Sequence, residues 1–280
     1  MTQAAPVASS TDVVGGTARL RLAFVRRHDG ATRLASSFAQ APLRAHRAFA
    51  MPDGTAVVTL VHVGPGLLAG DRLEVEVHVG AGASVILLAQ SATKVHTMPP
   101  GTSAGQSFRG TVEAGGRLEV HGGLVVPFPG AELSQETSID LVGDASVVWT
   151  ERWCLGRHRR GERATFRRMT SLLRIGRDGQ LSYADRLVLD ARPEAPVGPS
   201  TLGVLGAHDA LANGVALLPA PLTGTALRHE ASGVFDDGAS AYLRCLDHDP
   251  GPLRDVVFGF ANDVRAGQGL RRVDHVRYGA

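Results

Sequence analysis

The sequence predicts a mainly β fold: a stacked, solenoid-like β-helical architecture of many short strands, with about two helices near the C-terminal part. Three observations predict this class. Apolar and polar residues alternate in several segments, a strand–turn–strand pattern recurs along the chain, and 34 of the 280 residues are glycine. Glycine permits the tight turns that many short strands require.

The chain is expected to form one β-rich domain after a short tail. Residues 1–17 are small and polar with little periodicity, so we expect a disordered N-terminal tail. Residues 18–280 are then predicted to form a single domain, since all-β folds of this size often have one core. Alternation begins at Ala18–Val25 and returns at Leu73–Val79, which places successive side chains on opposite faces of a strand.

The strand–turn–strand pattern occurs four times, at intervals of roughly 28 to 35 residues. The four units are Val77–Leu88, Gly110–Val120, Ser138–Trp149 and Ser171–Tyr183. A repeat of this length favours stacked units, each of which contacts its neighbours. A β-sandwich would give a similar pattern and is the alternative architecture.

Two helices are expected late in the chain. The stronger candidate spans Leu253–Val264, where Val256, Val257 and Phe260 share one face with the two end residues. A prolyl first turn or Asp249 would begin this helix. The weaker candidate spans Leu222–Ala231.

Composition and charge exclude several classes of protein. The net charge is only +2, so the whole molecule is not a basic nucleic-acid binder. The two cysteines lack C-x-x-C spacing, and no segment resembles a signal peptide or a membrane span. We therefore expect a cytoplasmic protein with reduced thiols and no membrane or nucleic-acid partner.

Catalytic motifs are nearly absent. Gly101–Gly105 matches the G-x-S-x-G pattern around Ser103, but that motif requires a strand before the serine and a helix after it. Here two prolines precede the match and a strand-like segment follows, which predicts a hairpin loop. The protein is therefore not expected to be an enzyme. The alternative is a β-solenoid hydrolase of small molecules that uses Ser103 or a pair of carboxylates.

Metal-ligating and basic residues give weaker signals. The eleven histidines lie singly along the chain, without the spacing of a closed metal site, and His62 and His96 are the candidates for weak, transient metal contacts. A basic run extends from Arg157 to Arg168. It is interpreted as a solvated face or as a docking surface for an acidic protein.

Two segments together resemble one protein family. Val61–Leu73 has a glycine turn, an apolar pair and then Gly-Asp, and Leu88–Val95 reads Leu-Ala-Gln-Ser-Ala-Thr-Lys-Val. These closely resemble the "GGxxGGD" turn and the "TQxATKVY"-like strand of the urease accessory proteins of the UreD (UreH) family. Val126–Ala131 and the Glu151 to Glu162 region also resemble that family. The resemblance is strong over about residues 20 to 190 and weaker over 200 to 265.

The resemblance implies a function and a set of partners. UreD-type proteins have a stacked β-helical fold and a non-catalytic role in urease maturation. They join a UreF-type protein, and through it a UreG-type GTPase that carries nickel, to apo-urease. Nickel is thought to pass through an internal channel, so transient passage of Ni²⁺ is expected and no tightly bound cofactor is.

Five residues are the candidates for channel or partner contacts that the resemblance implies: Asp71, Thr93, Lys94, Glu151 and Glu162. Each has a structural alternative. Asp71 is better suited to capping its turn. The two glutamates could instead form salt bridges with Arg152, Arg157 or Arg163, since a buried carboxylate is costly unless paired or hydrated. Lys94 is either an inward ion-pair partner or an exposed strand residue. His96 stands where the family usually has tyrosine.

Overall fold

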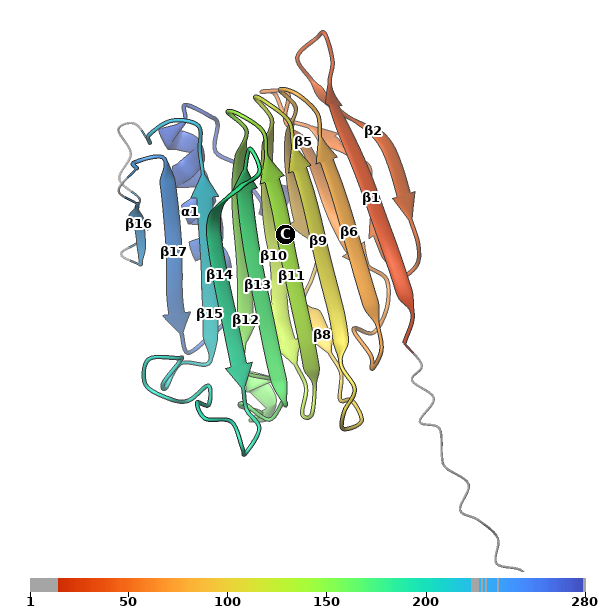
Figure 1. Cartoon of the computed structure of the whole chain (residues 1–280), viewed down its shortest axis with the longest axis vertical. Helices are drawn as coiled ribbons and strands as arrows, with labels where there is room; N and C mark the ends of the chain where they lie inside the picture. The colour runs from red at the N-terminus through yellow and green to blue at the C-terminus, as the bar shows by residue number, and fades with distance from the viewer. Residues whose placement is uncertain (1–14, 223–226, 228, 230, 236, 279–280) are drawn as a thin grey trace, which may run out of the picture.

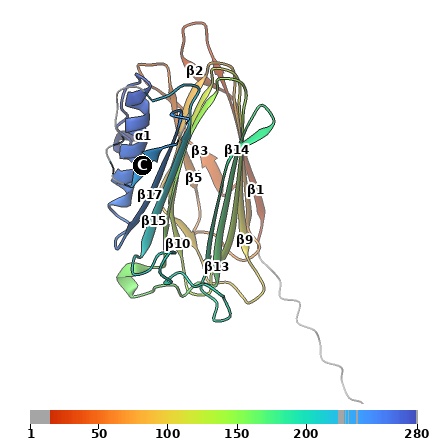
Figure 2. The ribbon, with the colours of Figure 1, turned by 60° about the vertical axis from the view of Figure 1, so that its left-hand side comes forward.

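A computed structural model of the chain describes residues 15–222, 227, 229, 231–235 and 237–278. Over these residues the strands form two sheets that face each other, and one α-helix lies against the outer side of one sheet (Figures 1 and 2). The residues 1–14 of the predicted tail lie outside this description, and the first strand begins at Thr17. The mainly β class is confirmed.

Sheet A, which faces the viewer in Figure 1, has the strand order β14-β13-β11-β9-β6-β1-β2 in the described chain. Its central strands run parallel, while β2 and β14 pair antiparallel at the two edges. The strands are β1 (Thr17–Arg26), β2 (Thr32–Ala39), β6 (Arg72–Val79), β9 (Ala104–Val112), β11 (Glu132–Leu141), β13 (Arg168–Arg177) and β14 (Gln180–Asp190).

Sheet B has the order β16-β17-β15-β12-β10-β7-β5-β3 over the described residues, with β4 added beside β5 and β8 beside β10. Strands β5, β7, β10 and β12 are parallel. The strands are β3 (Leu43–Ala45), β4 (Phe49–Ala50), β5 (Ala56–His62), β7 (Ser84–Ala89), β8 (Thr93–Val95), β10 (Arg117–Pro127), β12 (Ser146–Cys154), β15 (Ala210–Leu217), β16 (Ser232–Val234) and β17 (Ser240–Asp247).

Three of the four predicted repeat units are arches that carry the chain from sheet A to sheet B. The arches join β6 to β7, β9 to β10 and β11 to β12, and each adds one parallel strand to each sheet. This stacking confirms the solenoid-like prediction. The fourth unit, Ser171–Tyr183, belongs to the β13–β14 hairpin within sheet A, because its turn at Asp178 and Gly179 has positive φ at both residues and reverses the chain tightly.

The arch turns explain the glycines at their centres. Gly82, Gly115 and Gly143 have φ angles of +64°, +68° and +53°, a region that glycine enters without strain. A carboxylate from the next unit caps two of them. Gly115 donates its amide to Asp144 Oδ1 at 2.6 Å, and Gly143 donates to Asp178 Oδ1 at 2.8 Å. The repeat is therefore held together at the turns as well as along the strands.

The helix α1 (Leu253–Gly267) confirms the stronger helix prediction. Its apolar face packs on the outer side of β12, β15 and β17 (Figure 2). Gly214 permits a close approach, since a Cβ at this position would lie 3.0 Å from the Phe260 ring. The weaker candidate, Leu222–Ala231, includes residues outside the described ones. Two short 3₁₀ helices complete the described elements, η1 (His158–Arg160) and η2 (Val276–Tyr278).

The C-terminal residues cover the outer face of sheet B beside α1. Val273 packs on Val57 and Ile86, and the Thr59 hydroxyl donates to the Tyr278 carbonyl at 3.0 Å. Beneath this segment the fully buried Arg265 side chain binds the fully buried Glu119 carboxylate. The main apolar core lies on the other side of sheet B, between the two sheets.

Candidate functional site

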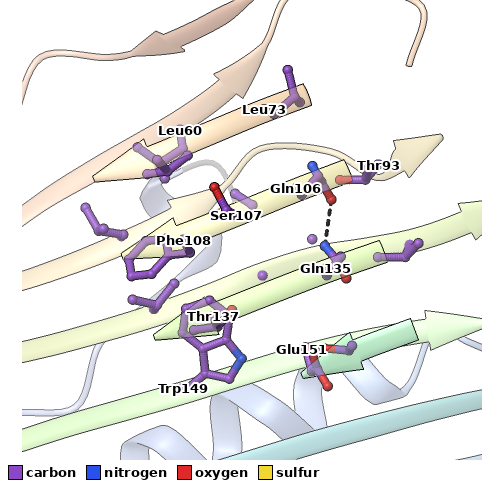
Figure 3. Close-up of a pocket in the computed structure, with 18 of the residues that line it drawn as sticks. Leu60, Leu73, Thr93, Gln106, Ser107, Phe108, Gln135, Thr137, Trp149 and Glu151 are labelled. Carbon is purple, nitrogen blue, oxygen red and sulfur yellow. Dashed lines mark hydrogen bonds between the residues drawn. The ribbon is translucent and has the colours of Figure 1, made fainter. Parts of the chain in front are cut away.

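Three adjoining cavities lie between the sheets. The central cavity, of about 160 Å³, is bordered by strands of both sheets and is drawn in Figure 3. It shares Thr93 and Gln106 with a second cavity of about 230 Å³, which we call the Lys94 cavity. It shares Trp149 and Glu151 with a third of about 300 Å³, the Arg244 cavity. The three form one cavity row that crosses the strands.

Polar side chains at matching positions of neighbouring strands line this row. In sheet A, Gln106 is in register with Gln135, which is in register with Ser171. Gln135 Nε2 donates to Gln106 Oε1 at 2.6 Å (Figure 3). In sheet B, Glu151, Asn213 and Arg244 are in register across β12, β15 and β17. Polar residues therefore replace the apolar inward residues along one line through the core. The residues of this polar row are Gln106, Gln135, Ser171, Glu151, Asn213 and Arg244.

A bulge in β10 contributes to the space at its centre. The pairing of β10 with β12 shifts between His121 and Leu124, so Gly122 and Gly123 lie opposite Glu151. Both glycines line the central cavity and have no side chain to fill it. The apolar side of the cavity is formed by Phe108 and Trp149, whose rings meet edge to face at 5.1 Å.

Glu151 is a carboxylate that faces this interior and has no cationic partner among the described residues. Its Oε1 accepts a bond from Asn213 Nδ2 at 3.1 Å, and its Oε2 accepts one from the Ser171 hydroxyl at 3.2 Å. Burial raises the pKa of Glu151, and these two hydrogen bonds oppose the shift. No ion pair to Glu151 occurs in the described part of the chain, so the predicted salt bridge does not form. A half-buried carboxylate in this state has spare oxygen lone pairs for a cation or for water.

The Arg244 cavity ends at an ion pair between the two sheets. Arg244 NH2 of β17 lies 2.6 Å from Asp185 Oδ2 of β14. Tyr183 and Glu151 line the same cavity. Burial, with a further contribution from Asp185, raises the pKa of Tyr183 to about 12. The Asp185–Arg244 pair therefore forms the solvent end of the polar row, with the arginine side chain 53% exposed.

The other end of the cavity row contains three of the predicted residues. Thr93 lines both the central and the Lys94 cavity, Lys94 itself is exposed, and His62 lines the Lys94 cavity from β5. Burial lowers the pKa of His62, partly opposed by the charge of Asp71. Lys94 makes no ion pair within the described residues. Of its two alternatives, an exposed strand residue is therefore the one that the structure shows. Ser91, beside them, has a positive φ of +62°.

Asp71 caps its turn, as the sequence suggests. Its Oδ2 accepts the Leu68 amide at 2.7 Å, and its Oδ1 accepts the Gly16 amide at 3.2 Å. Gly66, with φ +134°, lies against the Lys94 carbonyl, where a Cβ would approach to 2.5 Å. The turn and the strand β8 are thus one packed unit.

Comparison with known proteins identifies the family. The family model described as "UreD urease accessory protein" matches residues 16–273. The chain is 34% identical over 254 residues to a urease accessory protein UreD of Deinococcus radiodurans, covering 86% of this chain and 90% of that one. It is 39% identical to UreD 1 of Synechococcus sp. (strain JA-3-3Ab), covering 66% and 68%. The chain belongs to the UreD family.

The remaining predicted residues lie apart from the cavity row. Glu162 forms an ion pair with Arg157 near η1, with Nε to Oε2 at 2.7 Å, and this bond lowers the pKa of Glu162. The salt-bridge alternative therefore describes Glu162 but not Glu151. His96 Nε2 lies 2.9 Å from the Pro65 carbonyl, and its ring meets Phe128 edge to face. No cluster of three or more potential metal ligands is found among the described residues.

Two sequence motifs have structural roles. Ser103 is followed directly by strand β9 and not by a helix, so the G-x-S-x-G match lacks the geometry of a nucleophile elbow. The basic run is largely paired within the chain: Arg157 with Glu162, Arg163 with Asp209, Arg167 with Glu132 and Arg168 with Asp190. No helix in the described part of the chain is long and apolar enough to span a membrane.

Most residues of the polar row were not predicted from the sequence, although the sequence contains a signal for them. Gln106 and Gln135 stand among mostly apolar inward residues of β9 and β11, and they are 29 residues apart. That separation equals the offset between the paired strands. A polar residue that recurs at the repeat interval predicts a polar line through a stacked fold. Asp185 and Arg244 had no such signal, because their pairing crosses from one sheet to the other.

Proposed function

We propose that this protein is a non-catalytic urease maturation factor that passes nickel through the cavity row. Membership of the UreD family supports the role in urease maturation. The observation that carries the transport step is the cavity row, whose three cavities share lining residues from the Lys94 end of the molecule to the Arg244 end. As a scaffold, the protein would join UreF-type and UreG-type partners to apo-urease in the cytoplasm.

The chemistry of the polar row suits a cargo that must leave again. Amide and hydroxyl oxygens from Gln106, Gln135 and Ser171 are weak ligands for a divalent transition metal, and Glu151 adds a carboxylate. Conduction requires binding that is favourable enough for entry but weak enough for exit. Ni²⁺ is therefore proposed as a transient cargo and not as a resident cofactor.

The alternative of a small-molecule hydrolase has less support. Ser103 lacks a nucleophile elbow. Glu151 and Asp185 line the same cavity, but Asp185 is bound to Arg244. Neither arrangement provides an activated nucleophile. Nucleic acid and membrane are not proposed as partners.

The decisive experiment compares variants of Glu151 with a variant of Glu162. Glu151→Leu and the isosteric Glu151→Gln remove the carboxylate from the cavity row, whereas Glu162→Leu removes a carboxylate from a surface ion pair. We expect both Glu151 variants to lower the nickel content and activity of urease while they still co-purify with the UreF-type and UreG-type partners. Glu162→Leu should leave nickel content unchanged. Normal nickel loading with both Glu151 variants would contradict transport through the row.

The scaffold role has a test of its own. Deletion of the gene should abolish urease activity and nickel content without lowering the amount of urease protein. Tagged protein should co-purify with both partner types and with apo-urease. Normal nickel loading in the deletion strain would contradict the maturation role itself, independently of the route that nickel takes.

A further inference from the structure

The Arg244 cavity lies where both sheets end. In the described chain, strand β14 is the edge of sheet A, and β17 with the short β16 forms the edge of sheet B (Figure 1). Tyr183 and Asp185 line the cavity from β14, and Tyr242 and Arg244 line it from β17. Each pair is two residues apart on its strand, so both members face the same side. The cavity thus reaches the surface between two strands, with the Asp185–Arg244 ion pair across it.

Hydrogen-bond acceptors collect inside this cavity. Asn213 is 6% exposed and donates its Nδ2 to Glu151, which leaves Asn213 Oδ1 without a hydrogen-bond partner among the described residues. The charged residues in the lining are two carboxylates, Asp185 and Glu151, and one arginine, Arg244. A buried acceptor without a partner, beside an excess of carboxylates, favours a ligand that is cationic and carries several N–H groups.

Aromatic rings border the entrance of the cavity. Phe235 meets Tyr183 with ring centroids 6.4 Å apart and Tyr242 with centroids 5.1 Å apart. Phe235 and Tyr242 are each 40% exposed. Gly233 is in register with Tyr242 and leaves room for its ring, since a Cβ there would lie 2.7 Å from the tyrosine hydroxyl. No cation lies over any of the three rings within the described chain, so their faces are available for one.

A guanidinium group fits these features better than an ammonium group. It is planar and weakly hydrated, so it stacks on aromatic rings, and its five donors form a fork that can reach several acceptors. The acceptors here come from two sides, Asp185 on β14 of sheet A and Asn213 on β15 of sheet B. A guanidinium beside Glu151 would also favour its carboxylate form, which burial disfavours.

The rim of the entrance indicates that a protein carries this group. Val234, next to Phe235, is exposed, and so is Leu181, two residues before Tyr183. Together with Phe235 and Tyr242 they place apolar surface around a charged cavity. Protein interfaces commonly have this arrangement, in which an arginine of one partner enters a pocket and apolar neighbours exclude water. A free small cation would leave the apolar rim unused.

We propose that the Arg244 cavity is a docking site for an arginine side chain on the surface of a partner protein. The guanidinium of the partner stacks on Phe235 and Tyr242. It donates to Asp185 and to Asn213 Oδ1, and so competes with Arg244 for the aspartate. The assignment of the partner as a urease maturation protein rests on the proposed function, whereas the preference of the cavity for arginine does not.

Binding of capped amino acids to the purified full-length chain tests the chemistry. N-acetyl-arginine methylamide is titrated and followed by saturation-transfer NMR, and the lysine analogue and the neutral citrulline analogue are the comparison ligands. We expect the arginine probe to bind more tightly than the lysine probe and at least about tenfold more tightly than the citrulline probe.

Variants of the cavity should change this binding in opposite directions. Asp185→Asn should weaken binding of the arginine probe by about tenfold, and Phe235→Leu should weaken it too. Arg244→Gln should strengthen binding, because it removes the competing guanidinium. A purely structural ion pair would give the same direction for Asp185→Asn and Arg244→Gln, since either change breaks the same bond. Asp140→Asn, at an exposed position of β11, is the control and should have no effect.

A cross-link in cells tests the partner. Val234→p-benzoylphenylalanine places a photoreactive group at the rim, and mass spectrometry identifies the cross-linked peptide. We expect this peptide to contain an arginine whose replacement by glutamine removes the cross-link. If the citrulline probe binds as well as the arginine probe, or if Arg244→Gln weakens binding, the cavity is not an arginine site. If the arginine probe binds but no protein cross-links, the site takes a free guanidino compound and the docking proposal is wrong. Nickel content of urease is measured separately, so failure of nickel passage does not decide this proposal.

Discussion

Single polar residues in the polar row give the interior of this β stack groups that can bind water or a cation. An inward glutamate would normally be costly, and Glu151 is tolerated because Ser171 and Asn213 donate to it and the bulge at Gly122–Gly123 leaves space for water. Burial favours the protonated form, so a cation that approaches Glu151 competes with a proton. The polarity of the row is thus decided by a few side chains and not by the fold.

Asp71 gives a prediction about stability. Asp71→Ala removes the acceptor for the Leu68 and Gly16 amides, and we expect it to lower the free energy of unfolding by about 1 to 3 kcal/mol. Asp71→Asn keeps one acceptor oxygen and should cost less than the alanine change. Urea unfolding followed by tryptophan fluorescence measures both. Equal stability of wild type and Asp71→Ala would show that the turn does not depend on this carboxylate.

Particular residues show why the sequence predicted some site members and not others. Asp71 was predicted to cap its turn because a Gly-Asp turn is a local feature, which needs no knowledge of tertiary contacts. The unlike environments of Glu151 and Glu162 were not predictable, because strand register and the paths of loops decide which carboxylate meets an arginine. Asp185 and Arg244 lie on different sheets. They form an ion pair only because the two sheets face each other.

At the scale of elements, α1 and the C-terminal segment are held to sheet B by charge as well as by apolar contact. The helical spacing of apolar residues predicted the helix and its buried face, including Val257 and Phe260. It could not predict that Arg265 is fully buried on this helix, since arginine normally lies at the surface. The carboxylates that make this burial possible, Glu119 and Asp53, come from distant segments.

This arrangement predicts that acid loosens the C-terminal elements. Burial, with the nearby charge of the other histidine, lowers the pKa of His121 to about 3, and burial lowers that of His275 to about 4. The unfolded chain, with a histidine pKa of 6.5, therefore binds these protons first. Stability should fall as pH drops below 6.5, by about 1 kcal/mol per histidine between pH 6.5 and 5.5. The charged groups that face them are Glu119, Arg152, Arg265 and Asp274.

Glu119 adds a second, more acidic phase. Burial alone would raise its pKa, but Arg117 and Arg265 outweigh burial and hold the pKa at about 2. Its contribution to stability is therefore present above pH 4.5 and is lost as pH falls from there.

Urea unfolding from pH 7.5 to 5.0 measures the histidine phase separately from the Glu119 phase. His275→Phe keeps a ring stacked on Phe258. We expect it to reduce the dependence of the free energy of unfolding on pH by the contribution of one histidine. An unchanged slope would contradict the assignment.

For the whole molecule, stacking explains why one polar line can cross an otherwise apolar core. Each arch repeats the same inward positions, so a polar residue at one repeat position meets its counterparts in the next strand. The period in the sequence was sufficient to predict this stacking. It was not sufficient to predict the two facing layers or the cavities between them, because those depend on side-chain volumes from both sheets, such as Trp149 opposite Phe108.

Blocking the cavity row tests this arrangement directly. Ala89 of β7 lines both the central and the Lys94 cavity, so Ala89→Phe places a ring at their junction without replacing a polar group. Because the ring fills existing space, we expect little loss of stability, normal co-purification with partners and a strong fall in the nickel content of urease. Ala184→Phe, at an exposed position of β14, is the matched control and should leave nickel content unchanged. If Ala89→Phe folds, binds its partners and still supports full nickel loading, nickel does not pass between the Lys94 cavity and the central cavity.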